Sequence, residues 1–266
     1  MEGTNNEQEM LDAFLRAGTR AELVHLKQIL GKTTGVGSQR NLEDYQILIF
    51  PGGWSAGDYI RAGAIFAARL RAEAKRDLEQ FVEAGKPVGG MCNGFQVLVE
   101  LGLLPQLGTQ TSAPQAEAAL ATNDSDRFEC RPTYLRAETS KCAFTGAIKK
   151  GDVLYIPSAH GEGKFTLPPE EEAATLRRLD EEGRIVFRYV NPETGLPDGY
   201  PYNPNGSPSN IAALCNSAGN VFGIMPHPER SYLGINHPDW TRRRRGEWGD
   251  GKQVFDSVIG YATKKF

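Results

Sequence analysis

The first pattern along the chain is that of an amphipathic helix. Within residues 7–17, apolar side chains recur every three or four positions, which is the spacing of one face of an α-helix. Either Asn5 or Asn6 stands where the N-cap of this helix is expected, and Gly18 stands where the helix should stop. The same reasoning predicts a second helix over residues 71–84.

Strand-like runs alternate with these helices. Residues 45–50 (YQILIF) are apolar almost throughout, which is typical of a strand that is covered on both faces. Shorter apolar runs predict further strands at 21–26, 86–91, 130–136, 153–157, 184–190, 210–215 and 221–225. The alternation predicts an α/β fold with a mostly parallel, doubly wound sheet and helices on both faces. We expect a single domain over residues 1–266, in which the Pro- and Gly-rich residues 191–210 form an insertion or a hairpin connection.

Composition narrows the class of protein. The 266 residues are 39% apolar and 24% charged, and the formal net charge is -3, so no basic surface for nucleic acid or anionic membrane is indicated. No apolar run reaches the roughly 18–20 residues of a membrane span. The four cysteines form no CxxC pair, which argues against a zinc ribbon or a thioredoxin-type motif. A cytoplasmic, reduced protein is expected.

The segment Gly90-Met91-Cys92-Asn93-Gly94 joins a predicted strand to a predicted helix that ends at Gly102. This spacing is that of a nucleophile elbow, with Cys in the place of Ser. Small residues allow a sharp turn, and the thiol then faces the helix N-terminus, where the macrodipole favours the thiolate. The N–H of Asn93 can donate to an oxyanion. A buried free cysteine in a Gly-rich turn is the alternative, but the spacing favours a catalytic Cys92.

A thiolate nucleophile needs a partner that moves protons, and His227 lies in the segment MPHPER just after an apolar strand. Pro226 and Pro228 keep the backbone extended, so His227 and Glu229 project to the same side. Glu229 can then hold one imidazole nitrogen while the other faces the thiol. A His-X-Glu segment alone is more often structural, but together with Cys92 it predicts a Cys-His-Glu triad.

Three other features remain open. Pro51-Gly52-Gly53 can direct a backbone N–H into a pocket as a second oxyanion donor, although it is also an ordinary turn. His160, in SAHGEG, is either a pocket residue or a structural one, and we interpret His25 and His237 as structural. The run Arg242–Arg245 is interpreted as a solvated helix face or a subunit contact. No Walker-type loop or GxGxxG is present, so no nucleotide site is predicted.

Further motifs extend over nearly the whole chain with family-like spacing. They are EGTNNEQEM (2–10), PGGWSAGDYIRAGAI (51–65), GKPVGGMCNGFQVLVELGLLP (85–105), AHGEGKF (159–165), NPNGSPSNIAALCNSAGNVFGIMPHPER (203–230) and GKQVF (251–255). Together these segments resemble the class I glutamine amidotransferases, and more closely the glutaminase subunits of phosphoribosylformylglycinamidine synthase. The resemblance implies a flavodoxin-like fold.

The resemblance also implies a reaction. The Cys92 thiolate would attack the side-chain amide of glutamine, His227 would transfer the proton and Glu229 would orient the imidazole. Ammonia would leave, and water would hydrolyse the γ-glutamyl thioester to glutamate.

The implied binding groups come from three segments. The resemblance assigns the oxyanion hole to the backbone N–H groups of Gly53 and Asn93. It assigns substrate contacts to Gly52, Gln96 and, less directly, His160.

Partners are implied in the same way. In this family, ammonia travels through a channel to a separate ATP-dependent synthetase subunit, which makes formylglycinamidine ribonucleotide, often together with a small third subunit. ATP and Mg²⁺ are therefore expected on the synthetase, and no cofactor or metal is expected in this chain. No nucleic acid and no membrane is expected as a partner.

Two alternatives belong to other classes of protein. A stand-alone cysteine hydrolase of γ-glutamyl substrates would share the elbow and act without a partner. A catalytically silent interaction subunit would keep the fold but not the activity. The joint presence of Cys92, His227 and Glu229 argues against this alternative, because packing does not require all three.

The start of the chain carries one more expectation. A doubly wound sheet should begin with a strand, whereas this sequence opens with polar residues and a helix. In the resembling family a short apolar strand precedes the segment that matches EGTNN, between the strands placed here at 21–26 and 45–50. We therefore expect Met1 to be a misassigned start or boundary, with roughly 6–10 further residues upstream that supply this strand.

Overall fold

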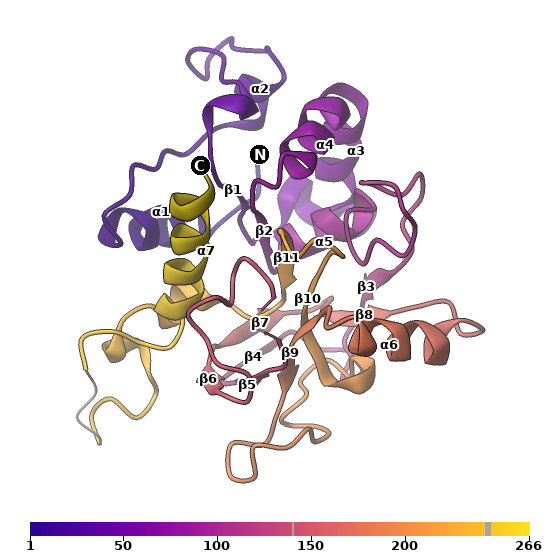
Figure 1. The fold of residues 1–266 in the computed structure, drawn as a ribbon, viewed down its shortest axis with the longest axis vertical. Coiled ribbons are helices and arrows are strands. Elements are labelled where there is room, and N and C mark those ends of the chain that lie inside the picture. The colour runs from indigo at the N-terminus through magenta and orange to yellow at the C-terminus, as the bar shows by residue number, and fades with distance from the viewer. Residues whose placement is uncertain (140, 243–245) are drawn as a thin grey trace.

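A mixed seven-stranded sheet forms the centre of the computed structural model, which describes residues 1–139, 141–242 and 246–266 (Figure 1). In this part of the chain the strand order is β1-β2-β11-β10-β9-β5-β6. The pairs β1–β2 and β2–β11 are parallel, and the other four pairs are antiparallel. The strands are β1 (Leu48–Phe50), β2 (Val88–Met91), β11 (Val221–Ile224), β10 (Ile211–Cys215), β9 (Ile185–Tyr189), β5 (Tyr134–Ala137) and β6 (Val153–Tyr155).

Two short antiparallel ribbons accompany the sheet. One pairs β3 (Ala119–Ala121) with β8 (Lys164–Thr166), and the other pairs β4 (Glu129–Arg131) with β7 (Ser158–His160). The last residue of β7 is one of the candidate site residues, His160.

Helices cover both faces of the parallel part of the sheet (Figure 1). Residues of β11 alternate between two cores: Val221 packs in the core that α3, α4 and α5 share, whereas Phe222 and Ile224 pack in the core of α1 and α7. The bounds are α1 (Glu7–Arg16), α3 (Ala64–Glu73), α4 (Lys75–Glu83), α5 (Asn93–Glu100) and α7 (Lys252–Lys265), and the remaining helices are α2 (Leu26–Ile29) and α6 (Glu172–Glu181). In the described residues, no helix combines the length and apolar character needed to cross a bilayer.

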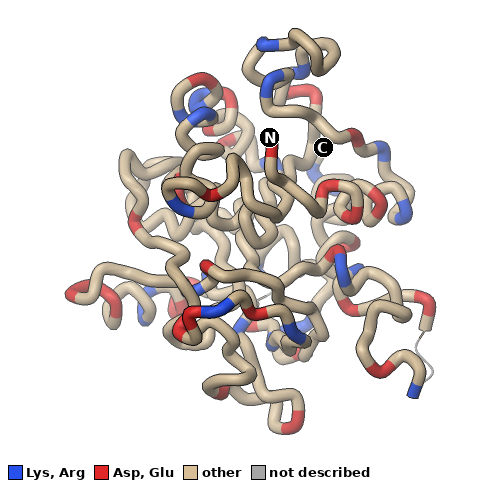
Figure 2. Tube along the Cα trace, turned by 180° about the vertical axis from the view of Figure 1, so that it is seen from behind, with Lys and Arg blue, Asp and Glu red and all other residues tan. Residues whose placement is uncertain are grey.

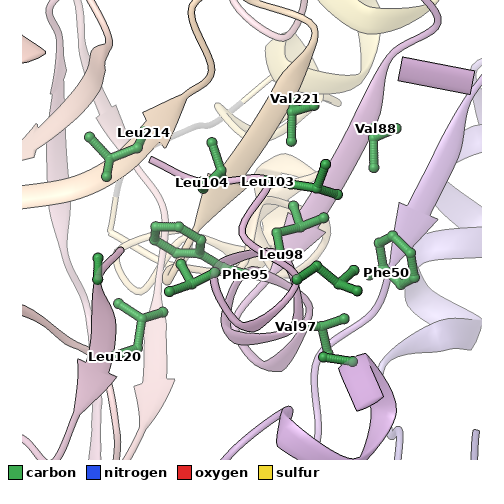
Figure 3. Packing of buried hydrophobic residues seen from close by; sticks show 14 of the residues in the cluster. Phe50, Val88, Phe95, Val97, Leu98, Leu103, Leu104, Leu120, Leu214 and Val221 are labelled. Atoms are coloured by element: carbon green, nitrogen blue, oxygen red, sulfur yellow. The ribbon is translucent and has the colours of Figure 1, made fainter. Parts of the chain in front are cut away.

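Helix α5 lies inside the core rather than on the surface. Its residues Asn93 to Val99 are all buried, and Figure 3 shows Phe95, Val97 and Leu98 surrounded by apolar side chains of the neighbouring strands and loops. Each large apolar side chain buried in this way contributes about 1.5–3 kcal/mol. Because α5 begins directly after Cys92, this packing also fixes the position of the cysteine.

The predicted α/β class with helices on both faces is confirmed, but the expectation of a mostly parallel sheet holds only around β1, β2 and β11. The reason lies in the connections. Five residues, 216–220, join β10 to β11, which is too short for the crossover that a parallel pair needs. Residues 191–210 likewise return the chain from β9 to its antiparallel neighbour β10, so the predicted hairpin connection is confirmed.

Several predicted elements have different bounds. Residues 21–25 are not a strand but an irregular segment leading into α2, where the His25 side chain accepts a hydrogen bond from the N–H of Lys27 at 3.2 Å. The helix predicted over 71–84 is two helices, α3 and α4, separated at Ala74. The strand predicted over 130–136 is split into β4 and β5 at Pro132, which has no N–H for a ladder.

Strand β1 forms one end of the sheet in the described residues. A groove of 1110 Å³ lies beside it, with Phe14, Val24, Ile47 and Ile49 among the lining residues. No strand of the described residues occupies this groove. The additional strand expected upstream of Met1 stays a prediction.

Charged residues of both signs are interspersed along the chain trace in Figure 2. This agrees with the near-neutral balance of 30 basic and 33 acidic residues. Arg243–Arg245 lie outside the described residues, so the interpretation of the run from Arg242 to Arg245 is not tested.

Candidate active site

The backbone at Cys92 makes a strained turn between β2 and α5. Cys92 has φ 53° and ψ -109°, a conformation that non-glycine residues rarely adopt and that clusters at functional sites. The flanking glycines make the turn possible: a Cβ on Gly90 would lie 2.4 Å from the carbonyl oxygen of Gly94, and a Cβ on Gly94 would lie 2.0 Å from that of Phe50. The structure thus has the elbow geometry that the spacing predicts.

His227 lies opposite this turn, on the segment that follows β11. Its N–H donates to the carbonyl of Pro157 at 2.8 Å, and its Nδ1 lies 2.5 Å from Oε1 of Glu229. A carboxylate can only accept, so Nδ1 carries the proton of this hydrogen bond. A Cβ on Gly52 would lie 3.1 Å from Cε1 of His227 and 3.2 Å from Cβ of Cys92, so both side chains flank the same glycine.

Electrostatics favour an imidazolium at His227. Burial lowers the pKa of His227, but attraction by the Glu229 carboxylate and by Cys92 outweighs burial and raises this pKa to about 10. For Glu229, burial raises the pKa, while the charge of His227 and hydrogen bonds hold it below its usual range. At neutral pH the structure therefore places a positive charge next to Cys92.

Asn6 is a site residue that the sequence analysis missed. It is fully buried and occupies the N-cap position of α1, which is one of the two predicted N-caps, but its side chain makes no capping hydrogen bond. Instead its Nδ2 donates to Oε1 of Glu229, and its Oδ1 accepts the N–H of Gly52 at 2.5 Å. Asn6 therefore joins the acid of the candidate triad to the Pro-Gly-Gly turn.

The two predicted oxyanion donors belong to the Pro-Gly-Gly turn and to the first turn of α5. Asn93 is the first residue of α5, where a backbone N–H has no acceptor within the helix. Gly53 has φ 124° and forms a bridge with Thr4, and in the described residues its N–H has no acceptor. Of the two residues, Gly53 lines the pocket beside Cys92, whereas Asn93 is fully buried, so the paired oxyanion role stays a prediction.

A pocket of 170 Å³ opens at Cys92. This volume is well below the roughly 300–1,000 Å³ of sites for drug-sized ligands, so the pocket suits a small molecule. Four of the predicted site residues besides Cys92 line this pocket: Gly53, Gln96, His160 and His227. The other three, Gly52, Asn93 and Glu229, are not among the lining residues.

Gln96 and His160 are held by polar neighbours. Gln96 accepts from the Asn93 side chain at 2.9 Å and donates to the carbonyl of Glu162 at 2.6 Å. Burial, together with the charge of His227, lowers the pKa of His160 to about 3, so this imidazole is neutral. His160 is among the residues that line the pocket, while its role in substrate binding stays a prediction.

The other histidines lie away from this pocket, as interpreted from the sequence. His25 caps α2, and His237 pairs with Asp239 at 2.5 Å and packs on the ring of Tyr155. In the described residues, no group of three or more His, Cys, Asp or Glu side chains is placed to hold a metal ion.

Comparison with known proteins gives a consistent match. Residues 1–262 match the model of the CobB/CobQ-like glutamine amidotransferase domain. A protein from Archaeoglobus fulgidus named phosphoribosylformylglycinamidine synthase subunit PurQ is 51% identical over 265 residues, which are 99% of this chain and 95% of the relative. A protein of the same name from Picrophilus torridus is 45% identical, over 87% of this chain and 85% of the relative.

Solved structures agree with the sequence matches. A chain of the structure of PurLQS from Thermotoga maritima superposes with a TM-score of 0.70 at 32% identity, covering 97% of this chain and 94% of that chain. A glutamine amidotransferase from Thermotoga maritima matches with a TM-score of 0.52 at 15% identity, over 96% of this chain and 91% of that chain. The second match shows similarity of the fold alone.

Proposed function

The chain belongs to the glutamine amidotransferase family, and we propose that it is the glutaminase subunit of a phosphoribosylformylglycinamidine synthase. The observation that carries this proposal is the placement of Cys92, on a strained elbow, beside the buried His227–Glu229 pair at a small pocket. The names of the full-length relatives supply the substrate and the partner.

Attack is the first step. The His227 imidazolium keeps Cys92 as a thiolate, which adds to the amide carbon of glutamine and pushes the carbonyl electrons onto oxygen. The N–H groups of Gly53 and Asn93 stabilise the resulting oxyanion, a contribution that is typically about 3–4 kcal/mol for each donor.

Proton transfer then releases ammonia. The Nε2–H of His227 protonates the amide nitrogen, the C–N bond breaks and a γ-glutamyl thioester remains on Cys92. Neutral His227 next takes a proton from water, and the hydroxide attacks the thioester. Glutamate leaves, and the thiolate–imidazolium pair is restored. Glu229 stabilises the imidazolium and holds its ring.

The pocket mouth is suited to a partner subunit. Trp54 and Phe128 line the pocket and stack with ring centroids 6.0 Å apart, although each is about half exposed. Tyr59 and Ile60 follow the same turn and are 89% and 72% exposed. Exposed apolar side chains gathered in this way are typical of a protein interface. They support docking of the synthetase over the mouth, where it receives ammonia.

The remaining components belong to the partners under this proposal. We assign ATP, Mg²⁺ and the ribonucleotide substrate to the synthetase, and we assign a place in the complex to a small third subunit. The name of the similar PurLQS structure, from another organism, supports an assembly of this kind.

Reconstitution with the synthetase tests the proposal. Cys92→Ala should abolish glutamine-dependent synthesis, by roughly a thousandfold or more, and leave synthesis from added ammonium salts intact. The reason is that the thiolate serves only the release of ammonia. Loss of both activities in a complex that still assembles would contradict this division of labour.

Labelling with a glutamine-analogue electrophile separates the alternatives. A glutaminase subunit should be labelled at Cys92 at a rate that rises with the synthetase and its ligands. A stand-alone hydrolase should be labelled equally well without the partner, and a silent interaction subunit should not be labelled at all.

A further inference from the structure

His160 reaches the pocket on a strand that contacts both the thiol and the imidazole of the triad residues. The carbonyl of Pro157, just before β7, accepts the backbone N–H of His227 at 2.8 Å. The carbonyl oxygen of Ala159 lies 3.6 Å from Sγ of Cys92. His160 follows directly at the end of β7, and it lines the pocket together with Cys92 and His227. The strand therefore places a second imidazole beside the nucleophile.

One edge of the His160 ring is occupied by neighbours. Its Nδ1 lies 3.2 Å from Oδ1 of Asn123, which also accepts the N–H of Gly163 at 3.1 Å. The Asn123 amide cannot be turned around, because its Nδ2 donates to the backbone carbonyls of Arg127 and His160, each at 2.8 Å. Nδ1 of His160 therefore carries a proton and donates it. A Cβ on Gly163 would lie 2.5 Å from this Nδ1, so the backbone also packs closely against this edge. Both the tautomer and the orientation of the ring are thus fixed.

The other ring nitrogen of His160 is a buried acceptor. His160 is 3% exposed, and no described residue makes a hydrogen bond to its Nε2. Burial, together with the charge of His227, lowers the pKa of His160 to about 3, so Nε2 accepts hydrogen bonds and holds no proton at neutral pH. Buried acceptors are costly to leave unsatisfied, which indicates that Nε2 receives a donor while the pocket is in use.

His227 contributes a second such nitrogen to the same pocket. Its Nδ1 is held by Glu229, and its Nε2 is buried and likewise makes no hydrogen bond to a described residue. In the proposed reaction this Nε2 gives its proton to the departing ammonia, so it is an acceptor once the thioester has formed. Two buried acceptors and the thioester on Cys92 then share one pocket of 170 Å³. Water has two donor hydrogens on one nucleophilic atom, so it matches this arrangement.

We propose that His160 positions the water that hydrolyses the thioester. One O–H bond of this water is directed to Nε2 of His227 and the other to Nε2 of His160, so that a lone pair of the oxygen faces the thioester carbon. As the oxygen adds to this carbon, His227 takes the first proton, and the C–S bond then breaks with Cys92 leaving as the thiolate. His160 only accepts a hydrogen bond, and the second proton leaves on the γ-carboxyl group, which ionises in solvent. This inference rests on the proposed function and assigns a residue to its second half-reaction.

The proposed role separates the two halves of the reaction. Formation of the thioester needs the thiolate and the proton of His227, so loss of the water acceptor should leave this step unchanged. Hydrolysis of the thioester should become slower. When only a step after acylation slows, kcat and KM fall together and kcat/KM is unchanged. A residue that binds glutamine would instead raise KM, and a residue that supports only the fold would lower kcat/KM.

The experiment uses His160→Leu and His160→Gln in the reconstituted complex. Leucine removes the acceptor, while Oδ1 of Asn123 keeps the hydrogen bond from the N–H of Gly163. For His160→Leu we expect kcat for glutamine to fall about 10- to 100-fold, KM to fall in parallel, and kcat/KM to stay within about threefold of the wild type. Acid-quenched His160→Leu should carry a γ-glutamyl group on Cys92, detected by mass spectrometry.

Two further variants complete the comparison. The side chain introduced by His160→Gln can direct an amide oxygen into the pocket, so this variant should recover at least about threefold of the lost kcat. His25→Leu, at the histidine that caps α2 outside this pocket, is the matched control and should keep the wild-type kcat and KM.

Labelling of Cys92 by the glutamine-analogue electrophile reports on the site independently of hydrolysis, because it requires only attack by the thiolate. His160→Leu should be labelled at the wild-type rate. Normal labelling with a raised KM, or a lowered kcat without accumulated thioester, would overturn the role in water positioning although the wild-type complex is a glutaminase. Loss of labelling would show a structural role for His160 and would overturn it as well. If the wild-type complex does not hydrolyse glutamine, the proposed function fails and this inference fails with it.

Discussion

The Asn6 side chain donates a hydrogen bond to the buried carboxylate of Glu229, and the two residues are 223 positions apart in the sequence. The same side chain accepts the N–H of Gly52. One amide thus links the start of the chain, the Pro-Gly-Gly turn and the acid of the proposed triad. This arrangement makes the geometry of the site depend on a residue that does not itself line the pocket but lies 3.2 Å from Nδ1 of His227, which does.

We expect Asn6→Ala to lower kcat for glutamine about 10- to 100-fold. The substitution removes one hydrogen bond to a charged group and leaves the Gly52 N–H without its acceptor, and each loss is worth about 1–3 kcal/mol. Synthesis from ammonium in the complex should be unchanged. Gln8→Ala on the exposed face of α1 is the control. A variant with wild-type kcat would show that Glu229 needs no support from Asn6.

Glu229→Gln should be less damaging than Cys92→Ala or His227→Ala. Glutamine can still accept from Nδ1 of His227, so the ring keeps its orientation, while the charge that stabilises the imidazolium is lost. Nucleophile and proton carrier make and break bonds, and the orienting acid does not. We expect about 10- to 100-fold more residual glutaminase activity than in Cys92→Ala, measured as glutamate formed in the complex. Equal residual activity in the three variants would contradict this ranking.

Tyr59→Ser and Ile60→Ser should weaken docking of the synthetase. Both side chains are largely exposed in the isolated chain, so their replacement costs little folding free energy, whereas an apolar anchor at an interface is commonly worth about 1–2 kcal/mol. We expect about 5- to 30-fold higher Kd in titration calorimetry. Leu196→Ser, at another exposed apolar side chain, is the control. If the control and the two variants bind equally, the partner does not dock on this surface.

Sequence patterns predicted those parts of the site that local backbone geometry determines. Cys92 lies at a strand–helix junction flanked by glycines, and His227 and Glu229 are two residues apart on one segment. Asn6 could not be found in this way, because an asparagine before a helix ordinarily indicates a cap. Its role depends on a contact that only the folded chain creates.

The same limit applies to the secondary structure. Strands β3, β4, β7 and β8 have three residues each, which is too short to show a period, and their pairing depends on partners far along the chain. Residues 21–25 have the composition of a strand, but in the described residues no neighbour pairs with them. Tertiary contacts therefore decided what apolar composition alone could not.

The pKa of His227 links the site to the pH dependence of stability. This pKa is about 10 in the folded chain against 6.5 for an ordinary histidine, so the folded state binds the proton more tightly. The resulting stabilisation is fully present below about pH 6.5 and is lost as the pH rises through about 10. The free energy of unfolding of the wild type should therefore fall more between pH 7 and pH 10.5 than that of His227→Gln, in urea titrations at a series of pH values.

Nuclear magnetic resonance of labelled histidine provides the direct measurement. The Cε1–H signal of His227 should titrate well above pH 8, and Cys92→Ser should move its midpoint down, because attraction by Cys92 contributes to the raised pKa. Glu229→Gln should also move it down, since the charge of the carboxylate is the largest single cause that raises this pKa. The buried, neutral His160 should not titrate in this range, and it serves as the internal control. If His227 of the wild type titrated with a midpoint near pH 6.5, the imidazolium that the proposed mechanism places beside Cys92 would not exist at neutral pH.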